Sequence, residues 1–158
     1  MKILNVIENI DEVTGGGVAE RTRQLGSHLT NLGHDITVLT INQNLSPSNI
    51  ASLGPVKLIS IPCMIKRFHV PLPFFRRINK AVKNADIVHL VSHWSILNAL
   101  TFICLRINKK PYVITPLGAL PIFGRSGLIK RIYNFMIGIN IIRKANICVV
   151  ATLEELVA

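Results

Sequence analysis

The fold is decided by residues 2–41, which read KILNVIENIDEVTGGGVAERTRQLGSHLTNLGHDITVLTI. Lys2–Ile7 is a short, mostly apolar run that predicts a buried strand. Apolar residues at helical spacing within Val18–Leu32 predict a helix. Asp35–Ile41 is rich in β-branched residues and predicts a second strand. The stretch therefore predicts a strand–helix–strand unit with three glycines, at 15–17, at its first junction.

The same alternation continues along the rest of the chain. Further strands are expected at residues 56–61, 86–91, 111–115 and 145–151. Helices are expected at residues 74–84, 95–108 and 127–143, and a proline-containing loop at 62–73. Strands that alternate with helices and are apolar on nearly all sides predict a Rossmann-like α/β fold, with a parallel sheet covered by helices on both faces.

We expect one domain over residues 1–151, followed by the start of a helix. Thr152 is typical of a helix N-cap, and Glu154 and Glu155 suit a first helical turn. Residues 152–158 are therefore expected to begin a helix that the chain does not finish. We interpret this ending as a chain shorter than its natural length, in which a C-terminal domain is absent.

The composition excludes a disordered chain and indicates an anionic partner. Apolar residues make up 49% of the 158 residues, and the mean hydropathy is +0.43. The formal net charge is +10, and residues 57–153 hold fifteen Lys or Arg against one acid, Asp86. Such asymmetry is typical of a chain that meets nucleic acid, anionic lipid or a phosphate-bearing substrate. A solvated basic face is the alternative.

Cysteine usage and hydropathy bear on the compartment. Cys63, Cys104 and Cys148 are odd in number and lack metal-ligand spacing, so we expect free thiols in a reducing, cytoplasmic compartment. No secretory signal is recognised. Residues 87–105 are uncharged, but polar residues interrupt the run, so no transmembrane helix is expected there. Peripheral contact with the inner face of a membrane stays open as an alternative.

Three loops are expected at one edge of the sheet. In an open parallel sheet, ligands bind beyond the carboxyl ends of the strands, near the point where the strand order reverses. The loops at such ends are residues 8–17, 92–94 and 116–126. Because the first and fourth expected strands are neighbours in a Rossmann-like order, we expect these loops to face one crevice.

Gly15, Gly16 and Gly17 are the first candidate site. Glycines at a strand–helix junction let the backbone approach a phosphate or a sugar hydroxyl, and a helix N-terminus favours an anion. A turn without a ligand is the alternative. The spacing does not match the dinucleotide fingerprint, because Glu20 stands where the third glycine belongs. It does not match a P-loop either, because no Gly-Lys-Ser/Thr follows.

His93 and Trp94 are the second candidate site, as residues suited to sugar binding. An indole face packs on a sugar ring, and an imidazole bonds a hydroxyl or exchanges a proton near neutral pH. The alternative is that Trp94 is a core residue and His93 caps the next helix. His89 lies within a strand and is expected to be a satisfied core histidine, and its spacing to His93 predicts no metal site. In the third loop, Gly118 allows unusual backbone angles and Arg125 offers a cation.

The helix expected at 74–84 is a candidate membrane surface. Its cations are Arg76, Arg77, Lys80 and Lys83, and its apolar neighbours are Phe74, Phe75 and Ile78. Cations beside apolar side chains suit an anionic membrane. The basic stretches lack the interleaved aromatic residues of a platform for single-stranded nucleic acid, so no nucleic-acid partner is expected.

Taken in order, these motifs resemble the N-terminal half of a family-4 glycosyltransferase of the GT-B fold. It is the ordered set, rather than any one motif, that carries the resemblance, and the set covers nearly the whole chain. The matching segments are the glycines with Asn31–Leu39, then Ala85–His89 with His93-Trp94, Lys110–Gly118, Lys130–Tyr133 and Arg143–Asn146.

The resemblance implies a retaining transfer of a hexose-type sugar from a nucleotide-sugar to a cell-envelope polysaccharide or lipid-linked acceptor, without a metal or cofactor. In the family, the N-terminal domain mainly binds the acceptor, and the C-terminal domain holds the nucleotide-sugar and a Glu-x7-Glu motif. The present chain alone is therefore expected to be inactive. By the same resemblance, Gly15, Gly16 and Gly17 lie close to the donor phosphates, and His93 and Trp94 line the cleft.

Two details of the family bear on this chain. Leu117 stands where many members have a histidine before the glycine of the fifth-strand loop. Membrane-associated members use basic, apolar surfaces of this domain to meet lipid-linked acceptors, which the composition of this chain suits.

Two alternatives belong to other function classes. A dinucleotide-binding oxidoreductase module needs a third glycine and an acid after its second strand, where Glu20 and the run Leu39–Ile41 stand instead. A non-catalytic basic domain that docks on membrane or nucleic acid would bind DNA with a steep salt dependence.

Overall fold

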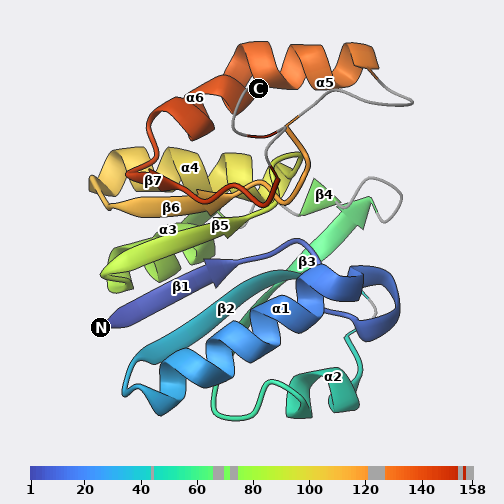
Figure 1. Ribbon diagram of the computed structural model, residues 1–158, viewed down its shortest axis with the longest axis vertical. Helices are drawn as coiled ribbons and strands as arrows, with labels where there is room; N and C mark the ends of the chain where they lie inside the picture. Colours follow the sequence, from blue (N-terminus) through green and yellow to red (C-terminus); the bar gives the residue numbers. More distant parts are fainter. Residues whose placement is uncertain (44, 66–69, 72–74, 121–126, 153–154, 156–158) are drawn as a thin grey trace.

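The computed structural model describes residues 1–43, 45–65, 70–71, 75–120, 127–152 and 155. This part of the chain forms a seven-stranded sheet in the order β4-β3-β2-β1-β5-β6-β7 (Figure 1). The strands are β1 (Lys2–Val6), β2 (Asp35–Asn42), β3 (Lys57–Ile65), β4 (Val70–Pro71), β5 (Ile87–Val91), β6 (Tyr112–Thr115) and β7 (Ile147–Cys148). β4 pairs antiparallel at the β3 edge, and the other pairs are parallel.

Helices cover both faces of the sheet, as the alternating pattern predicts. They are α1 (Glu12–Asn31), α2 (Pro47–Ala51), α3 (Phe75–Asn84), α4 (Ile96–Asn108), α5 (Gly127–Tyr133), the π-helical turn η2 (Asn134–Gly138) and α6 (Ile139–Arg143). α1 and α2 lie on one face, and α3, α4 and α6 on the other (Figure 1). Each face has its own core cluster, the larger one beneath α3, α4 and α6.

The central strand β1 marks the point where the strand order reverses. Ile3 of β1 pairs with Ile36 of β2 on one side and with Ile87 of β5 on the other. Alternate residues of these strands point to opposite faces, so Leu4 packs in the larger core cluster while Ile36 packs in the smaller one. The predicted Rossmann-like fold and the predicted neighbourhood of the first and fourth expected strands are confirmed.

Three local predictions are wrong. The expected loop at 62–73 is in part strand, because β3 continues through Pro62 to Ile65 and β4 pairs with its end at the sheet edge. Pro71 is tolerated there because an edge strand needs few backbone donors. A first helical turn from Glu12 was not expected, and the kink at Gly16 separates it from the helix expected over Val18–Leu32. The short helix α2 was not expected either.

The end of the chain follows the prediction only in outline. The strand expected over 145–151 is confined to Ile147–Cys148. The hydroxyl of Thr152 accepts a hydrogen bond from the Glu155 backbone N–H at 3.3 Å, as expected of an N-cap. The rest of the helix expected over 152–158 lies outside the described residues, as does Glu154. Cys63, Cys104 and Cys148 are free thiols, as predicted.

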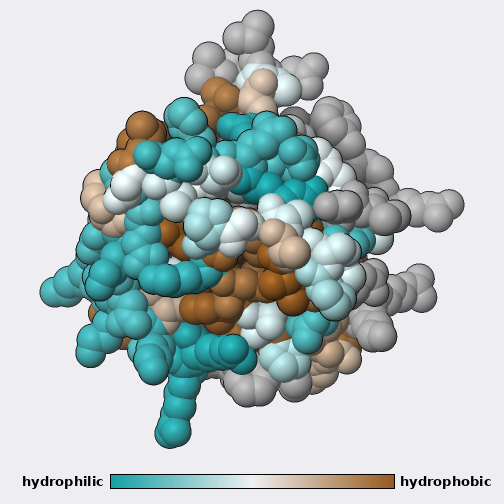
Figure 2. Space-filling view, turned by 90° about the horizontal axis from the view of Figure 1, so that it is seen from below, coloured by the Kyte–Doolittle hydropathy of each residue, from teal (hydrophilic) through white to brown (hydrophobic). Residues whose placement is uncertain are grey.

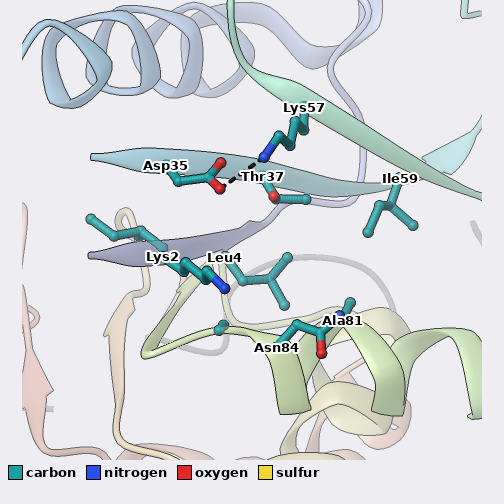
Figure 3. A pocket seen from close by; sticks show the side chains of 10 residues that line it. Lys2, Leu4, Asp35, Thr37, Lys57, Ile59, Ala81 and Asn84 are labelled. Carbon is teal, nitrogen blue, oxygen red and sulfur yellow. Dashed lines mark hydrogen bonds and ion pairs between the residues drawn. The ribbon is translucent and has the colours of Figure 1, made fainter. Parts of the chain in front are cut away.

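Where no described helix covers the sheet, apolar residues reach the surface. Seen from below, hydrophobic residues occupy the middle of the molecule with hydrophilic residues around them (Figure 2). At the amino ends of β1–β3, a groove opens between the sheet and α3, with Thr37 and Ile59 on its floor (Figure 3). The high mean hydropathy of the chain is thus accompanied by apolar residues at its surface.

The start of α1 generates a stability prediction. Asp11 is buried, and its carboxylate accepts hydrogen bonds from the Thr14 backbone N–H at 2.9 Å and from the Asn49 amide at 2.9 Å. Asp11→Ala removes the cap and leaves the Asn49 amide without this partner, at a cost of about 2–4 kcal/mol. Urea denaturation of wild type and variant measures the loss. Asp11→Asn, which keeps a capping oxygen, is the control and is expected to lose less, and equal losses in both variants would contradict this account.

Candidate functional site

The carboxyl ends of β1, β5 and β6 bring the predicted loops together at one edge of the sheet. β1 leads into α1, β5 leads into His93 and Trp94, and β6 leads into Leu117 and Gly118. The Ser92 backbone N–H donates to the Thr115 carbonyl at 2.9 Å, which joins the second and third loops. Residues 121–126, with Gly124 and Arg125, lie outside the described residues.

The three glycines lie inside α1 rather than in a loop before it. Asp11 caps the helix, which begins at Glu12. The helical backbone is then interrupted at Gly16, whose φ of 51° and ψ of −143° are left-handed and non-helical. The glycines therefore form a kink in the first turns of α1, near the helix N-terminus where the sequence predicted an anion-binding turn.

The three glycine positions differ in whether they could hold a larger residue. A Cβ on Gly15 would lie 2.8 Å from the Asn9 carbonyl oxygen and 2.7 Å from the Ala19 Cβ, so this position needs a hydrogen. Gly16 needs its positive φ, which other residues adopt only with strain. Gly17 is exposed, and a Cβ there would meet nothing within 4 Å. Gly17 is thus required by neither packing nor backbone angle and has open space beside it.

His93 is buried and held by the helix opposite. Its side chain is 2% exposed, and Nε2 lies 2.8 Å from Oδ1 of Asn134. Because the amide oxygen accepts, Nε2 carries the hydrogen, and Nδ1 is left as a buried acceptor without a partner among the described residues. Burial lowers the pKa of His93, and the hydrogen bond to Asn134 opposes this shift. His93 is therefore a neutral imidazole near pH 7.

The cap of the next helix is Ser95 and not His93. The Ser95 hydroxyl accepts from the Asn98 backbone N–H at 3.4 Å, and α4 begins at Ile96. This excludes the alternative in which His93 serves as the cap. Ser95 as the N-cap is as the sequence predicts.

Trp94 belongs to an aromatic cluster that joins the β5 loop to α5. Its ring centroid lies 4.6 Å from that of His93 and 5.6 Å from that of Tyr133. Its indole N–H donates to the Ala119 carbonyl, and Lys130 Nζ lies 5.4 Å from its ring centroid. The half-buried indole therefore links the loop after β5, the loop after β6 and α5, and it is only in part a core residue.

The π-helical turn η2 positions the groups that face His93. The Tyr133 hydroxyl donates to the His93 carbonyl at 3.0 Å, while the next residue, Asn134, bonds the His93 ring. A Cβ on Gly138 would collide with the Asn134 amide oxygen and approach the Tyr133 ring to 2.9 Å. Gly138 and the wider π turn thus let two consecutive side chains reach the β5 loop, and π turns of this kind are frequent at functional sites.

A cavity of about 240 Å³ lies against His93, and we call it the site cavity. Its lining consists of His93, Leu120, Asn134, Ile139, Ile142 and Arg143. Asn134 and Arg143 were missed by sequence reasoning. Asn134 is one of two amides in segment 127–143, with Asn140, and nothing in the sequence distinguished it from Asn140 or Arg143 from the other cations.

Gly118 lies in a strained turn, and its backbone N–H already donates a hydrogen bond within the chain. Leu117 and Gly118 have φ values of 58° and 78°, so two successive residues are left-handed. The Gly118 N–H donates to the carboxylate of Glu155, which also accepts from the Ala151 N–H at 2.8 Å. Glu155 is only 3% exposed. The chain's own carboxylate therefore occupies the Gly118 donor in this structure.

His89 is a satisfied histidine, as predicted. Nδ1 lies 3.0 Å from Oδ1 of Asn5, and Nε2 lies 2.8 Å from the Thr115 hydroxyl. The imidazole thus joins β1, β5 and β6 across one face of the sheet. Burial first, and the charge of Arg21 second, lower the pKa of His89 to about 4.

The basic helix α3 lies apart from the site cavity. Arg76, Arg77, Lys80 and Lys83 are all exposed. Ile78 is fully buried in the larger core cluster, so its expected place on a membrane face beside the cations is wrong. Phe74 lies outside the described residues, and Phe75 is 37% exposed. α3 therefore presents a hydrophilic, cationic surface with one partly exposed aromatic residue.

A larger groove at the opposite edge of the sheet is a poor candidate site. Its volume is about 360 Å³, and Figure 3 shows Lys2, Leu4, Thr37 and Ile59 around it. Lys57 Nζ forms a salt bridge with Asp35 at 2.8 Å, and no other ion pair between side chains lining the groove is found among the described residues. The groove opens at the amino ends of the strands, whereas ligands of open α/β sheets bind at the carboxyl ends.

Metal and membrane-spanning features are not found in the described residues. Within these ranges, no three His, Cys, Asp or Glu side chains gather as metal ligands would. Across the same ranges, no helix has both the length and the apolar composition needed to cross a membrane.

The comparison with known families decides what kind of domain carries this site. The sequence model described as Glycosyltransferase Family 4 matches residues 15–154, which is most of the chain. The chain belongs to this family. Family membership supports a glycosyltransferase activity with a sugar donor and an acceptor, and it favours this class over the oxidoreductase alternative.

The other comparisons bear on the fold alone. A search of curated proteins finds no significant match. Among solved structures, the chain is similar to a wide-type short-chain dehydrogenase/reductase from Veillonella parvula, solved in complex with NADP. The TM-score is 0.51 at 15% identity, over 94% of this chain and 67% of that one. At this identity, the likeness supports the Rossmann-like α/β architecture and nothing about chemistry.

The half-buried His89 generates a prediction about pH. Its pKa of about 4 lies below the ordinary 6.5, so the folded state disfavours protonation. Between pH 6.5 and 4 the unfolded state binds more protons at His89 than the folded state does. The contribution of neutral His89 to the free energy of unfolding is therefore complete above pH 6.5 and is lost as the pH falls toward 4, on the order of 3 kcal/mol in total. We expect His89→Gln to flatten the pH dependence of unfolding free energy over this window, measured by urea denaturation.

A smaller slope should persist in the variant, because burial lowers the pKa of His93 as well. Identical slopes for wild type and His89→Gln would show that His89 is not the titrating group.

Proposed function

We propose that the chain is the acceptor-side, N-terminal domain of a retaining glycosyltransferase. The enzyme would move a hexose-type sugar from a nucleotide-sugar to a cell-envelope polysaccharide or lipid-linked acceptor. The observation that carries the proposal is the family match over residues 15–154. The place of the site cavity supports it, because the cavity lies beside the carboxyl end of β5, next to β1, where open α/β sheets bind ligands.

We assign acceptor binding to the site cavity. Its polar groups are the neutral imidazole of His93, the amide of Asn134 and the guanidinium of Arg143, and its other walls are apolar. A few convergent polar groups among apolar walls are typical of a small-molecule site. The His93 imidazole and the Asn134 amide are suited to bond sugar hydroxyls, and Arg143 is suited to a phosphate of a lipid-linked acceptor.

We assign the approach of the donor phosphates to the kink at Gly16 and Gly17. Both glycines are exposed, and neither has an atom within 4 Å of an added Cβ. They lie in the first turns of α1, where the helix dipole favours an anion. The nucleotide-sugar itself would be held by a C-terminal domain. The proposed transfer uses neither a cofactor nor a metal.

A second candidate role is contact with an anionic membrane at the cytoplasmic side. The four exposed cations of α3, Arg76, Arg77, Lys80 and Lys83, favour it. A non-catalytic basic domain would need only this contact. The proposed enzyme would use it to stay near a lipid-linked acceptor, and no nucleic-acid partner is assigned.

The open space beside Gly17 gives the first test. Gly17→Val, in the enzyme with its donor-binding domain, is expected to lower sugar transfer at least about tenfold, because the side chain fills the space proposed for the donor phosphates. Its melting temperature should stay close to that of wild type, since nothing lies within 4 Å of the new Cβ. Gly15→Ala is the matched control, expected to lower stability because its Cβ collides with the Asn9 carbonyl. Unchanged transfer by Gly17→Val would remove the kink from the site.

The division of labour between domains gives the second test. The purified 158-residue chain, incubated with a panel of nucleotide-sugars and a membrane extract as acceptor, is expected to transfer no sugar. Its acceptor-binding role predicts saturation-transfer NMR signals from an acceptor fragment, and His93→Gln is expected to weaken these. Turnover by the chain alone would contradict the proposed two-domain arrangement, whereas acceptor binding unaffected by His93→Gln would contradict the assigned cavity.

A further inference from the structure

A groove lies on the face of the sheet that carries α1, over strands that no described helix covers. α1 lies over β2, whereas β5 and β6 have no described helix on this side (Figure 1). The groove has a volume of about 280 Å³, and we call it the sheet-face groove. Because both faces of a parallel sheet are normally covered, an open stretch of this kind is a candidate binding surface.

The floor of the sheet-face groove is formed by side chains from three neighbouring strands. Ile3 of β1 pairs with Ile87 of β5, and Asn5 of β1 pairs with His89. His89 pairs in turn with Val113 of β6. Residues that pair across parallel strands point to the same side of the sheet, and all five line the groove. The three apolar ones are half-buried, so their hydrocarbon surface is partly open to solvent.

The walls of the sheet-face groove add further hydrocarbon. Leu25 and Leu29 of α1 lie four positions apart on one side of the helix and line the groove together. Val149, which follows β7, also lines it and is 39% exposed. The groove is therefore apolar along most of its length.

One end of the groove is polar. His89 Nδ1 lies 3.0 Å from Asn5 Oδ1, and His89 Nε2 lies 2.8 Å from the Thr115 hydroxyl oxygen. These three residues lie nearer the carboxyl ends of their strands than Ile3, Ile87 and Val113 do. Asn5 is 1% exposed, and its Nδ2 has no hydrogen-bond partner among the described residues. The polar end is thus not fully satisfied by the chain itself.

Arg21 supplies a cation at this polar end. Its side chain is exposed, and neither of the salt bridges found in the described ranges involves it. The charge of Arg21 contributes to the lowered pKa of His89, which places the guanidinium near the imidazole. Arg21 is the one charged side chain among the described residues that line the groove, and neither Asp nor Glu lines it there. Its positive charge is therefore available to an external anion.

The size and polarity of the groove favour a small molecule over a protein partner. An apolar cavity of about 150 Å³ holds a benzene molecule, so about 280 Å³ has room for an aromatic ring with a short chain. Protein interfaces have few charged residues at their core, whereas small-molecule sites combine apolar walls with a few polar groups. A guanidinium pairs best with a planar carboxylate, through two parallel hydrogen bonds.

We propose that the sheet-face groove binds a small organic acid, whose carboxylate pairs with Arg21 and whose apolar body lies on Ile3, Ile87 and Val113. The groove shares no lining residue with the site cavity, which lies among the loop after β5 and segment 127–143. The binding is therefore a second property of the domain and does not depend on sugar transfer.

The test is an NMR titration of the full 158-residue chain with phenylpropionate as the probe. We expect saturable binding that shifts the ring signals of His89 and the methyl signals of Val113, since both side chains line the groove. Phenylpropanol, which has the same ring and chain but a neutral head, is expected to bind roughly tenfold more weakly because it cannot pair with the guanidinium.

Two variants separate the contributions of the head and the body of the ligand. Arg21→Gln is expected to weaken phenylpropionate binding roughly tenfold and to leave phenylpropanol binding unchanged. Val113→Phe is expected to weaken both at least about tenfold, because the larger side chain fills the floor of the groove. Arg76→Gln is the matched control, since it removes an exposed arginine on α3, on the other face of the sheet, and it should change neither. Circular dichroism checks the fold of each variant, and the exposed Arg21 can be replaced without disturbing the core.

Four results would overturn the proposal. Equal binding of the acid by wild type and Arg21→Gln would remove the cation from the site. Equal affinities of wild type for the acid and the alcohol would leave only an apolar surface. Self-association of the chain that Val113→Phe abolishes would make this face a contact between copies. Absence of saturable binding would exclude a small organic acid altogether. None of these results bears on sugar transfer, so the proposed function is tested separately.

Discussion

The structure depends on burying both faces of a parallel sheet around β1. This strand pairs with β2 and β5, so chain segments on its two sides must reach it by crossovers on opposite faces. α1 covers one face, and α3 and α4 cover the other, each over its own core cluster. The reversal at β1 also separates the loops that leave β1 and β5. The site cavity lies on the β5 side of this reversal, between the loops after β5 and β6 and the helical segment 127–143.

Neutral, buried imidazoles characterise the site region. His89 is bonded by Asn5 and Thr115, and burial lowers its pKa to about 4. His93 is more deeply buried, at 2% exposed, but has only one of its two ring nitrogens bonded. The difference separates a histidine that holds strands together from one that lines the site cavity. Because sugar rings are polar but uncharged, the neutral imidazole of His93 suits them better than a cation would.

The helical segment 127–143 has two sides with different environments. Its inner side supplies Tyr133, Asn134 and Arg143 to the β5 loop and the site cavity. Its outer side carries exposed apolar side chains, among them Phe135 and Met136. The π turn at η2 serves the inner side, since it lets adjacent residues reach His93.

The sequence by itself determined the parallel α/β fold, the neighbourhood of β1 and β5, the Ser95 cap and the core role of His89, because hydrophobic period and caps are local properties. It missed β4 and the early start of α1, where Asp11 reaches Asn49 across 38 positions. It placed Ile78 beside the exposed cations of α3, although this residue is buried. Only the tertiary structure decided which side of segment 127–143 meets solvent, and that Asn134 and Arg143 face His93. The sequence of an apolar helix does not show which of its sides is exposed, because packing against residues distant in the chain determines that side.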